Sequence, residues 1–103
     1  MRIITNKPLR EFGDVNSHAR NSIEDWYKLA SSRMVIWNKP QDVVKTFGER
    51  NVDILQNNRV CIDIKGNDIR VVLKVEYGRG MAFVKWIGWH KDYERLGKNI
   101  HSI

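Results

Sequence analysis

The stretch from Arg59 to Glu76, RVCIDIKGNDIRVVLKVE, decides the fold. On both sides of Gly66-Asn67, aliphatic residues alternate with mostly polar ones, which is the pattern of a strand with one buried face. Gly-Asn suits a two-residue hairpin loop, and that loop sets the cross-strand pairs: Lys65 with Asp68, Asp63 with Arg70, and Arg59 with Lys74. Because successive side chains leave a strand on opposite sides, the sequence predicts an aliphatic face toward the core. The other face is polar, mostly cationic, and turned toward solvent or an anionic partner.

A third strand begins after Gly78-Arg79-Gly80, and its register depends on the length of the turn. With a two-residue Arg79-Gly80 loop, the core side carries Ala82, Val84 and Trp86, and the cationic side carries Met81, Phe83, Lys85, Ile87 and Trp89. A three-residue loop exchanges the two sets. We favour the two-residue loop because it places Lys85 beside Lys74. It also presents Phe83 or Trp89 for stacking on a nucleotide base, although aromatic residues in strands more often pack inside a protein.

The residues before the hairpin follow the helical period. A short helix is expected from about Lys7 to Phe12 or slightly beyond, with Pro8 in its first turn and Gly13 either ending or weakening it. From about Ala19 to Met34, apolar residues recur at helical spacing and predict a second helix: Ile23, Trp26, Tyr27, Ala30 and Met34. A third helix is expected between Pro40 and Gly48, with an apolar side formed by Val43, Val44 and Phe47.

The two remaining segments complete the expected order of elements. Residues 1–4 have the pattern of a short strand at the edge of the sheet, and residues 49–58 show no periodicity and are expected to form a loop. The order β-α-α-α-β-β-β predicts an α+β fold with the N-terminal helices packed on the aliphatic face of an antiparallel sheet. A chain of 103 residues has room for one domain, residues 1–103, with a modest core. We expect the tail from Gly97 to Ile103 to be frayed.

The charge balance indicates the kind of partner. Lys and Arg number 18 against 12 acidic residues, giving a formal net charge of +6 and a pI near 9.7. This excess favours a polyanion such as nucleic acid, although a merely solvated basic surface has the same composition. No apolar run approaches the roughly 20 residues that a membrane span requires, and residues 1–4 lead into polar sequence rather than a secretory signal. We therefore expect a cytoplasmic protein without membrane contact.

His90 and Tyr93 are the candidate proton-transfer groups. They lie three residues apart, so one helical turn would place both side chains on the same side. Their reference pKa values, near 6.5 and 10, suit proton transfer beside a cationic surface. Cleaving RNA through its own 2′-hydroxyl requires a base, an acid and positive charge at the phosphorus, and Arg59 and Arg70 would supply the charge. A histidine at the end of a strand is otherwise ordinary surface, so the prediction depends on these neighbours.

No metal or cofactor is expected from the residue pattern. The three histidines, His18, His90 and His101, have no ligand spacing, and the carboxylates are scattered. Phosphate-binding loops, dinucleotide-binding loops and nucleophile elbows are absent from the sequence. Cys61 is the single cysteine, which excludes an internal disulfide and a cysteine-cluster zinc site. We expect it to be a small, semi-buried strand residue, with a reactive thiol as the alternative.

Several short motifs occur in order between Met1 and about Glu94. They are Met1-Arg2-Ile3-Ile4-Thr5, Leu9-Arg10-Glu11-Phe12, Trp26-Tyr27, Trp37 with Lys39-Pro40, Asn58-Arg59-Val60, the run from Ile64 to Val72, and Gly88 with His90 and Tyr93. The most specific part is the series Asn-Arg-Val, Ile-Lys-Gly-Asn-x-x-Arg-Val-Val and Gly-x-His-x-x-Tyr. With these motifs the chain resembles the HigB toxin family of the RelE superfamily.

The resemblance implies an endoribonuclease toxin, or mRNA interferase, of a type II toxin–antitoxin system. Such toxins often cut mRNA in the A site of the 70S ribosome and thereby inhibit translation. A helix-turn-helix antitoxin of the HigA type would be the partner, and DNA would be contacted only through it. By matching position, the resemblance makes Arg59, Lys65 and Arg70 phosphate-binding or transition-state residues. It makes His90 and Tyr93 the pair that transfers protons or orients the substrate.

Further residues are candidates for RNA binding: Lys74, Lys85, Lys91, Arg79 and Trp89. The family often has a basic residue at position 85, whereas many members have a small or hydroxyl residue at position 89, so the base preference stays open. A non-catalytic RNA- or DNA-binding protein using the same basic face is the main alternative. A purely structural or regulatory partner protein is another.

Overall fold

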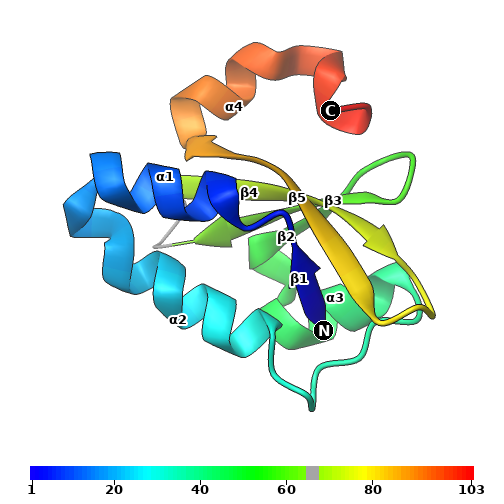
Figure 1. Ribbon diagram of the computed structural model, residues 1–103. Coiled ribbons are helices and arrows are strands. Elements are labelled where there is room, and N and C mark those ends of the chain that lie inside the picture. Colours follow the sequence, from blue (N-terminus) through cyan, green and yellow to red (C-terminus); the bar gives the residue numbers. More distant parts are fainter. Residues whose placement is uncertain (65–67) are drawn as a thin grey trace.

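The computed structural model describes residues 1–64 and 68–103 (Figure 1). Its main elements are β1 (Arg2–Ile4), α1 (Lys7–Val15), α2 (Arg20–Ala30), α3 (Pro40–Phe47), β2 (Val52–Ile54), β3 (Arg59–Ile64), β4 (Ile69–Glu76), β5 (Met81–Trp89) and α4 (His90–Leu96). Three short 3-10 helices complete the chain: η1 (Ser17–Ala19), η2 (Glu49–Asn51) and η3 (Gly97–His101). In the described part of the chain, none of these helices combines the length and apolar character needed to cross a membrane.

The strands form one sheet in the order β1-β5-β4-β3-β2. Strands β2 to β5 pair antiparallel, and β1 pairs parallel with β5 at the edge of the sheet. The predictions of an α+β fold and of an edge strand at residues 1–4 are therefore confirmed, but the sheet is mixed rather than wholly antiparallel. Parallel neighbours require a long connection, and the three helices between β1 and the rest of the sheet provide it.

The β3–β4 hairpin has the predicted register. Asp63 is paired with Arg70 and Arg59 with Lys74, whereas the predicted pair of Lys65 with Asp68 lies outside the described residues. Side chains on one face join the main core with residues from α1, α2 and α3: Val60, Ile62, Ile64, Ile69, Val71, Leu73 and Val75. Figure 1 shows α2 and α3 on one side of the sheet and α4 on the other. We call these sides the helix-packed face and the α4 face.

The N-terminal helices follow the predicted pattern with one correction. Helix α1 runs through Gly13, and α3 ends before Gly48, whose positive φ of 95° suits a glycine. Helix α2 buries Ile23, Trp26 and Ala30 but ends at Ala30. The prediction that the helix extends to Met34 is wrong, because the chain turns at Ser31 and leaves the Met34 side chain 89% exposed.

Strand β2 lies within residues 49–58, which were expected to form a loop. Val52 pairs with Ile62, and Asp53 pairs with Cys61 on the neighbouring strand β3. Three residues are too few for a recognisable alternation, and pairing with a strand formed later in the chain decides the conformation. The consequence is that Asp53 reaches the α4 face of the sheet beside Asp63 and Arg70.

Strand β5 contains a β-bulge that the sequence did not reveal. Val84 is opposite Leu73, but Trp86 is opposite Val72, so Lys85 is an extra residue in the strand. A bulge shifts the alternation of side chains by one. The predicted core positions of Ala82 and Val84 are confirmed, whereas Trp86 packs on the α4 face, and Ile87 and Trp89 pack on the helix-packed face. The turn before β5 is also longer than predicted, because Glu76 already pairs with Met81.

Gly88 makes room for the displaced Trp86 ring. A Cβ atom at position 88 would lie 2.6 Å from two carbons of that ring, closer than real contacts allow. The ring itself packs in a second, smaller core on the α4 face. Glycine at this position therefore accompanies the bulge and the rotation of Trp86.

The α4 face is covered in part by α4 and η3. Cys61, Val72 and Tyr93 are buried there together with partly buried apolar residues: Leu55, Trp86, Leu96, Ile100 and Ile103. The expectation of a frayed tail is wrong, because residues 97–101 form η3 and pack on this cluster. Polar contacts add to this packing: the Gln56 N–H donates to Nδ1 of His101 at 3.0 Å, and the Asn57 side chain donates to the His101 carbonyl at 2.8 Å.

Candidate active site

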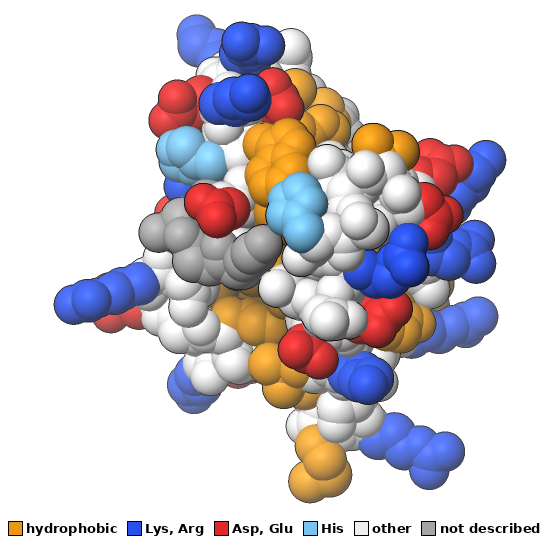
Figure 2. Space-filling model, turned by 90° about the vertical axis from the view of Figure 1, so that its left-hand side faces the viewer, with side chains coloured by type: hydrophobic (Ala, Val, Ile, Leu, Met, Phe, Trp, Pro, Cys, Tyr) orange, Lys and Arg blue, Asp and Glu red, His pale blue; other side chains and the backbone are white. Residues whose placement is uncertain are grey.

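A hollow of about 500 Å³ lies where β2, β3 and β4 meet the start of α4. Its lining comes from segments far apart in the sequence: Arg50, Asp53, Asp63, Asp68, Arg70 and His90. A second hollow of about 430 Å³ shares Asp68 and His90 and adds Trp89 and Lys91. Figure 2 shows one face of the molecule on which apolar side chains lie between two histidines, with acidic and basic side chains around them.

Arg70 lies between two carboxylates and an aromatic ring. Its Nε is 3.1 Å from Oδ1 of Asp63, and its Nη1 is 3.6 Å from Oδ2 of Asp53. The Nε–H is not aligned for a hydrogen bond, so the contact with Asp63 is a close ion pair. The guanidinium carbon lies 4.9 Å from the centre of the Tyr93 ring, within the range of a cation–π contact. Burial raises the pKa of Asp63, and the charge of Arg70 opposes this shift.

Tyr93 is buried beneath Arg70 rather than exposed in the hollow. Only 8% of the residue is accessible, and its ring also packs on Trp86, with the ring centres 6.0 Å apart. Burial raises the pKa of the Tyr93 hydroxyl well above its usual range, with the adjacent Cys61 thiol adding to the shift. Burial likewise raises the pKa of Cys61 to about 12. Cys61 is a small strand residue, as predicted, but it is fully buried rather than semi-buried. Both groups are neutral near pH 7.

His90 is the first residue of α4 and has two defined contacts. Its backbone N–H donates to the Asp68 carbonyl at 3.0 Å, and its Nε2 is 2.9 Å from Oε1 of Glu94. The Nδ1 atom is covered and has no hydrogen-bond partner among residues 1–64 and 68–103. The Glu94 carboxylate therefore orients the imidazole ring through Nε2.

Trp89 lies beside the second hollow. The prediction that it lies on the cationic face is wrong, because its side chain packs on the helix-packed face. Its ring centre is 5.3 Å from that of Phe12 and 5.7 Å from that of His18, which lies nearly parallel to it. The bulge at Lys85 explains this placement, because it turns the end of β5 toward α1. Lys91 lies next to it on α4 and is exposed.

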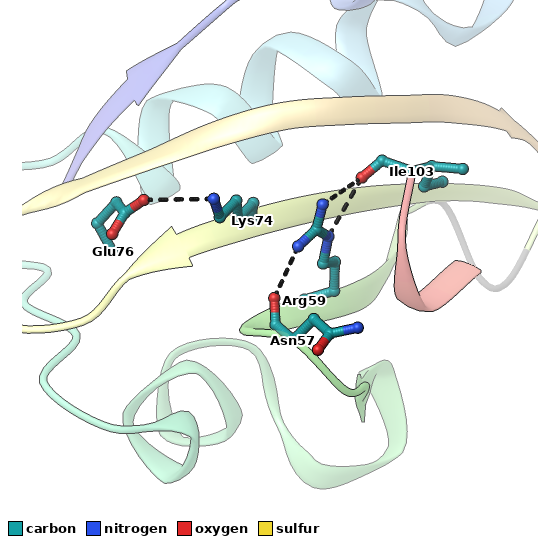
Figure 3. A network of polar contacts seen from close by, with 5 residues as sticks. All are labelled: Asn57, Arg59, Lys74, Glu76 and Ile103. Atoms are coloured by element: carbon teal, nitrogen blue, oxygen red, sulfur yellow. Dashed lines mark hydrogen bonds and ion pairs between the residues drawn. The ribbon is translucent and has the colours of Figure 1, made fainter. Parts of the chain in front are cut away.

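Arg59 is separated from the hollow and bound by the chain itself (Figure 3). Its Nη2 and Nε donate to the Ile103 main-chain oxygen at 2.8 and 3.2 Å, and its Nη1 donates to the Asn57 carbonyl at 2.9 Å. Asp63 is four positions farther along the strand, about 13 Å away at the usual rise per residue. Lys74 is close to Arg59 and forms an ion pair of 3.7 Å with Glu76.

Two further predicted residues, Lys85 and Arg79, do not line either hollow. Lys85 is exposed at the bulge, and Arg79 is exposed in the turn between β4 and β5. Lys65 lies outside the described residues. The structure therefore brings His90, Tyr93 and Arg70 together, with Lys91 and Trp89 beside them, and separates them from the cations on the rest of the sheet.

The hollow also contains residues that were not predicted: Arg50, Asp53, Asp63 and Asp68, with Glu94 at His90. Three carboxylates against two arginines contradict the expectation of a mostly cationic face, as far as the described residues are concerned. Only the pairing of Asp63 with Arg70 had a signal in the sequence, through the hairpin register. The described residues contain no group of three His, Cys, Asp or Glu side chains placed to hold a metal ion.

Comparison with known protein families identifies the group to which this fold and hollow belong. Residues 19–96 match the model of the HigB toxin family, described as the RelE-like toxic component of a toxin–antitoxin system. The chain belongs to this family. The match includes α2 to α4, and with them all residues of the hollow. No curated protein matches the chain well enough to count as a relative.

Membership confirms the resemblance found in the sequence. The chain is the toxin component of a toxin–antitoxin system, and an antitoxin is its partner. Ribonuclease activity is general among RelE-like toxins.

Proposed function

We propose that this HigB-family toxin is a metal-independent endoribonuclease that cuts mRNA on the translating ribosome and so inhibits translation. The observation that carries the proposal is the meeting of His90, fixed by Glu94, with Arg70 in one hollow. Cleavage of RNA by its own 2′-hydroxyl needs a group that transfers protons and a positive charge beside the phosphate. A histidine and an oriented guanidinium supply these. The site of action is then the cytoplasm, and DNA is reached only through the antitoxin.

In the proposed reaction the 2′-oxygen attacks the adjacent phosphorus, and the bond from phosphorus to the 5′-oxygen breaks. The proton of the 2′-hydroxyl leaves to a base, and the departing 5′-oxygen receives a proton. His90 serves one of these two transfers through Nε2 when Glu94 releases this nitrogen, because Nδ1 is covered. Arg70 stabilises the negative charge that builds on the phosphoryl oxygens. The products carry a 2′,3′-cyclic phosphate, or the 3′-phosphate from its hydrolysis, and a 5′-hydroxyl.

The exposed cations around the hollow have a binding role in this proposal. Lys91 lies at its rim, and Lys85 and Arg79 lie farther along β5 and the preceding turn. We assign these side chains to RNA or ribosome phosphates, with Trp89 beside the nucleotide next to the cleaved bond. Lys65 keeps its proposed phosphate contact from its place in the family motif. Arg59 and Lys74 contribute only if their contacts with Ile103 and Glu76 open.

The proposal is tested by inducing the full chain in bacteria and mapping new 5′ ends of mRNA. We expect cuts within translated regions, and we expect none after induction of the His90→Ala variant. Purified toxin should give 2′,3′-cyclic or 3′-phosphate ends on ribosome-bound mRNA, and RNA with a 2′-deoxy group at the cut site should resist. Products with 5′-phosphate ends would contradict the mechanism. RNA binding without new ends would favour the non-catalytic alternative.

A further inference from the structure

We propose that Asp63, Asp53 and Tyr93 form a clamp that holds the Arg70 guanidinium ready for a phosphate. In this inference, which rests on the proposed function, Tyr93 and Asp63 are positioning residues that act through Arg70. Tyr93 supplies its ring and not its hydroxyl, so it takes no part in proton transfer. His90 and Tyr93 therefore have different roles, although the sequence motif groups them as one pair.

The carboxylate side of the clamp is set by the backbone of the sheet. Asp63 and Arg70 are directly opposite each other on β3 and β4, and β2 brings Asp53 to the adjacent position. The side chains of Arg70 and Asp63 are only 15% and 10% exposed, which limits the positions that each can adopt. Because aspartate is short, its carboxylate lies close to the strand, and a fixed register gives a fixed position for the Nε edge of Arg70.

The aromatic side of the clamp is set by α4. The Tyr93 ring lies 4.9 Å from the guanidinium carbon and is itself held by Trp86 and by the small core of the α4 face. A planar guanidinium over a ring loses little further freedom when it binds an anion. The raised pKa of the Tyr93 hydroxyl supports the same conclusion, because a phenol that keeps its proton is a poor base near neutral pH.

The clamp leaves part of Arg70 for a substrate. A guanidinium has five N–H donors, and the two ion pairs engage the Nε and Nη1 atoms. A phosphate that reaches the hollow therefore meets a guanidinium that is already oriented. Preorganised charge of this kind acts in the transition state without a further cost of reorganisation.

Cleavage kinetics test the clamp with matched substitutions in the full chain. Tyr93→Leu and Asp63→Asn should each lower the single-turnover rate constant on the order of 10–100-fold, the loss typical of a misplaced catalytic group. The RNA concentration for half-maximal rate should change little. Tyr93→Phe should recover most of the loss and keep the wild-type pH profile. Asp14→Asn is the control, because it removes a carboxylate that forms an exposed ion pair with Arg20, away from the hollow.

A second measurement reports on the clamp without RNA cleavage. In ¹⁵N NMR spectra of the full chain, the Arg70 Nε–H signal should exchange slowly with water in the wild type and in Tyr93→Phe. It should exchange faster in Asp63→Asn and in Tyr93→Leu. If Tyr93→Leu does not fold, the wild type and Asp63→Asn decide the question.

The outcomes separate the clamp from the proposed function. A Tyr93→Phe variant as slow as Tyr93→Leu, with an altered pH profile, would assign proton transfer to the hydroxyl and overturn the inference. Unchanged Nε–H exchange in Asp63→Asn would overturn it as well. A wild-type chain that cuts no RNA would instead contradict the proposed function, and the exchange rates would still test the clamp.

Discussion

The two faces of the sheet bury side chains of different kinds. On the helix-packed face, β3 and β4 contribute only aliphatic residues, and helices from the N-terminal half cover them. On the α4 face, a small core around Cys61, Val72 and Tyr93 borders charged residues, and the covering elements are α4 and η3. The first face provides most of the apolar burial, whereas the second carries the hollow. A regular alternation of aliphatic residues therefore predicts the face that stabilises the fold. The functional face is the one on which charged residues interrupt the apolar pattern.

The largest effect should come from His90 and Arg70 on the α4 face. Because losing a general acid or base typically costs about 10²–10⁴-fold in rate, His90→Ala should abolish toxicity while the protein stays folded. Arg70→Ala should act similarly through lost stabilisation of charge. Growth after induction and mapping of mRNA ends measure both. Arg20→Ala is the control, since Arg20 forms an exposed ion pair with Asp14 away from the sheet. Full toxicity of both variants would remove the functional distinction between the faces.

Truncations in the two cores should differ in their effect on stability. Leu73 is fully buried on the helix-packed face, and Leu73→Ala should lower the free energy of unfolding by about 2–5 kcal/mol. Leu96 is only partly buried on the α4 face, so Leu96→Ala should have a clearly smaller effect. Urea unfolding of the two variants beside the wild type measures the difference. Equal losses would show that the α4 face stabilises the fold as much as the helix-packed face does.

Alkaline pH should destabilise the protein through the small core of the α4 face. The pKa of the Cys61 thiol is raised from 9.0 to about 12 in the folded protein. Between these values the unfolded chain loses the proton and the folded chain keeps it, so the free energy of unfolding falls as the pH rises. The slope should reach about 1.4 kcal/mol per pH unit for this group. It should be smaller in Cys61→Ala, and urea titrations from pH 8 to 11 compare the two. Equal slopes in the wild type and in Cys61→Ala would show that other groups cause the loss of stability at alkaline pH.

The smallest effect should come from the exposed lysines around the α4 face. Replacing Lys85 or Lys91 with Ala should reduce the salt dependence of RNA association by about 0.7 in slope for each lost phosphate contact. Lys74→Ala should change it less, because Lys74 is engaged with Glu76. Lys7→Ala is the control, since Lys7 forms an exposed ion pair with Glu11 on α1. Identical slopes in all four variants would mean that these lysines are only solvated.

Local patterns were sufficient where each element carried its own signal. The Gly66-Asn67 loop predicted that Asp63 lies opposite Arg70, which is the contact on which the hollow depends. Patterns failed where the conformation depends on distant partners. Strand β2 forms because it pairs with β3, and the bulge at Lys85 lets β5 contribute side chains to both cores. The packing of residues 97–103 likewise depends on the α4 face and not on any repeat within the tail.

The candidate site shows the same division at the level of side chains. His90 and Tyr93 were selected because their spacing fits one turn of a helix, and α4 has that turn. Their difference in burial could not be predicted, because it follows from the Trp86 ring and the tail. Arg59 was grouped with Arg70 by its position on the face, but its guanidinium is bound to Ile103. Spacing thus predicts which residues share a face, and packing decides which of them meet.

The extra residue at Lys85 has a consequence for how the length of β5 can change. Residues before the bulge and residues after it belong to opposite phases of one strand, so Val84 and Ile87 share a core while Trp86 joins the other. Deleting Lys85 would remove the bulge and leave Val84, Trp86 and Ile87 on their present faces, because a strand without a bulge alternates in that order. A deletion or insertion elsewhere in β5 would instead exchange the faces of all residues on one side of it. A change of length is therefore tolerable at position 85 and not at its neighbours, and homologous chains should place any gap in this segment at that position.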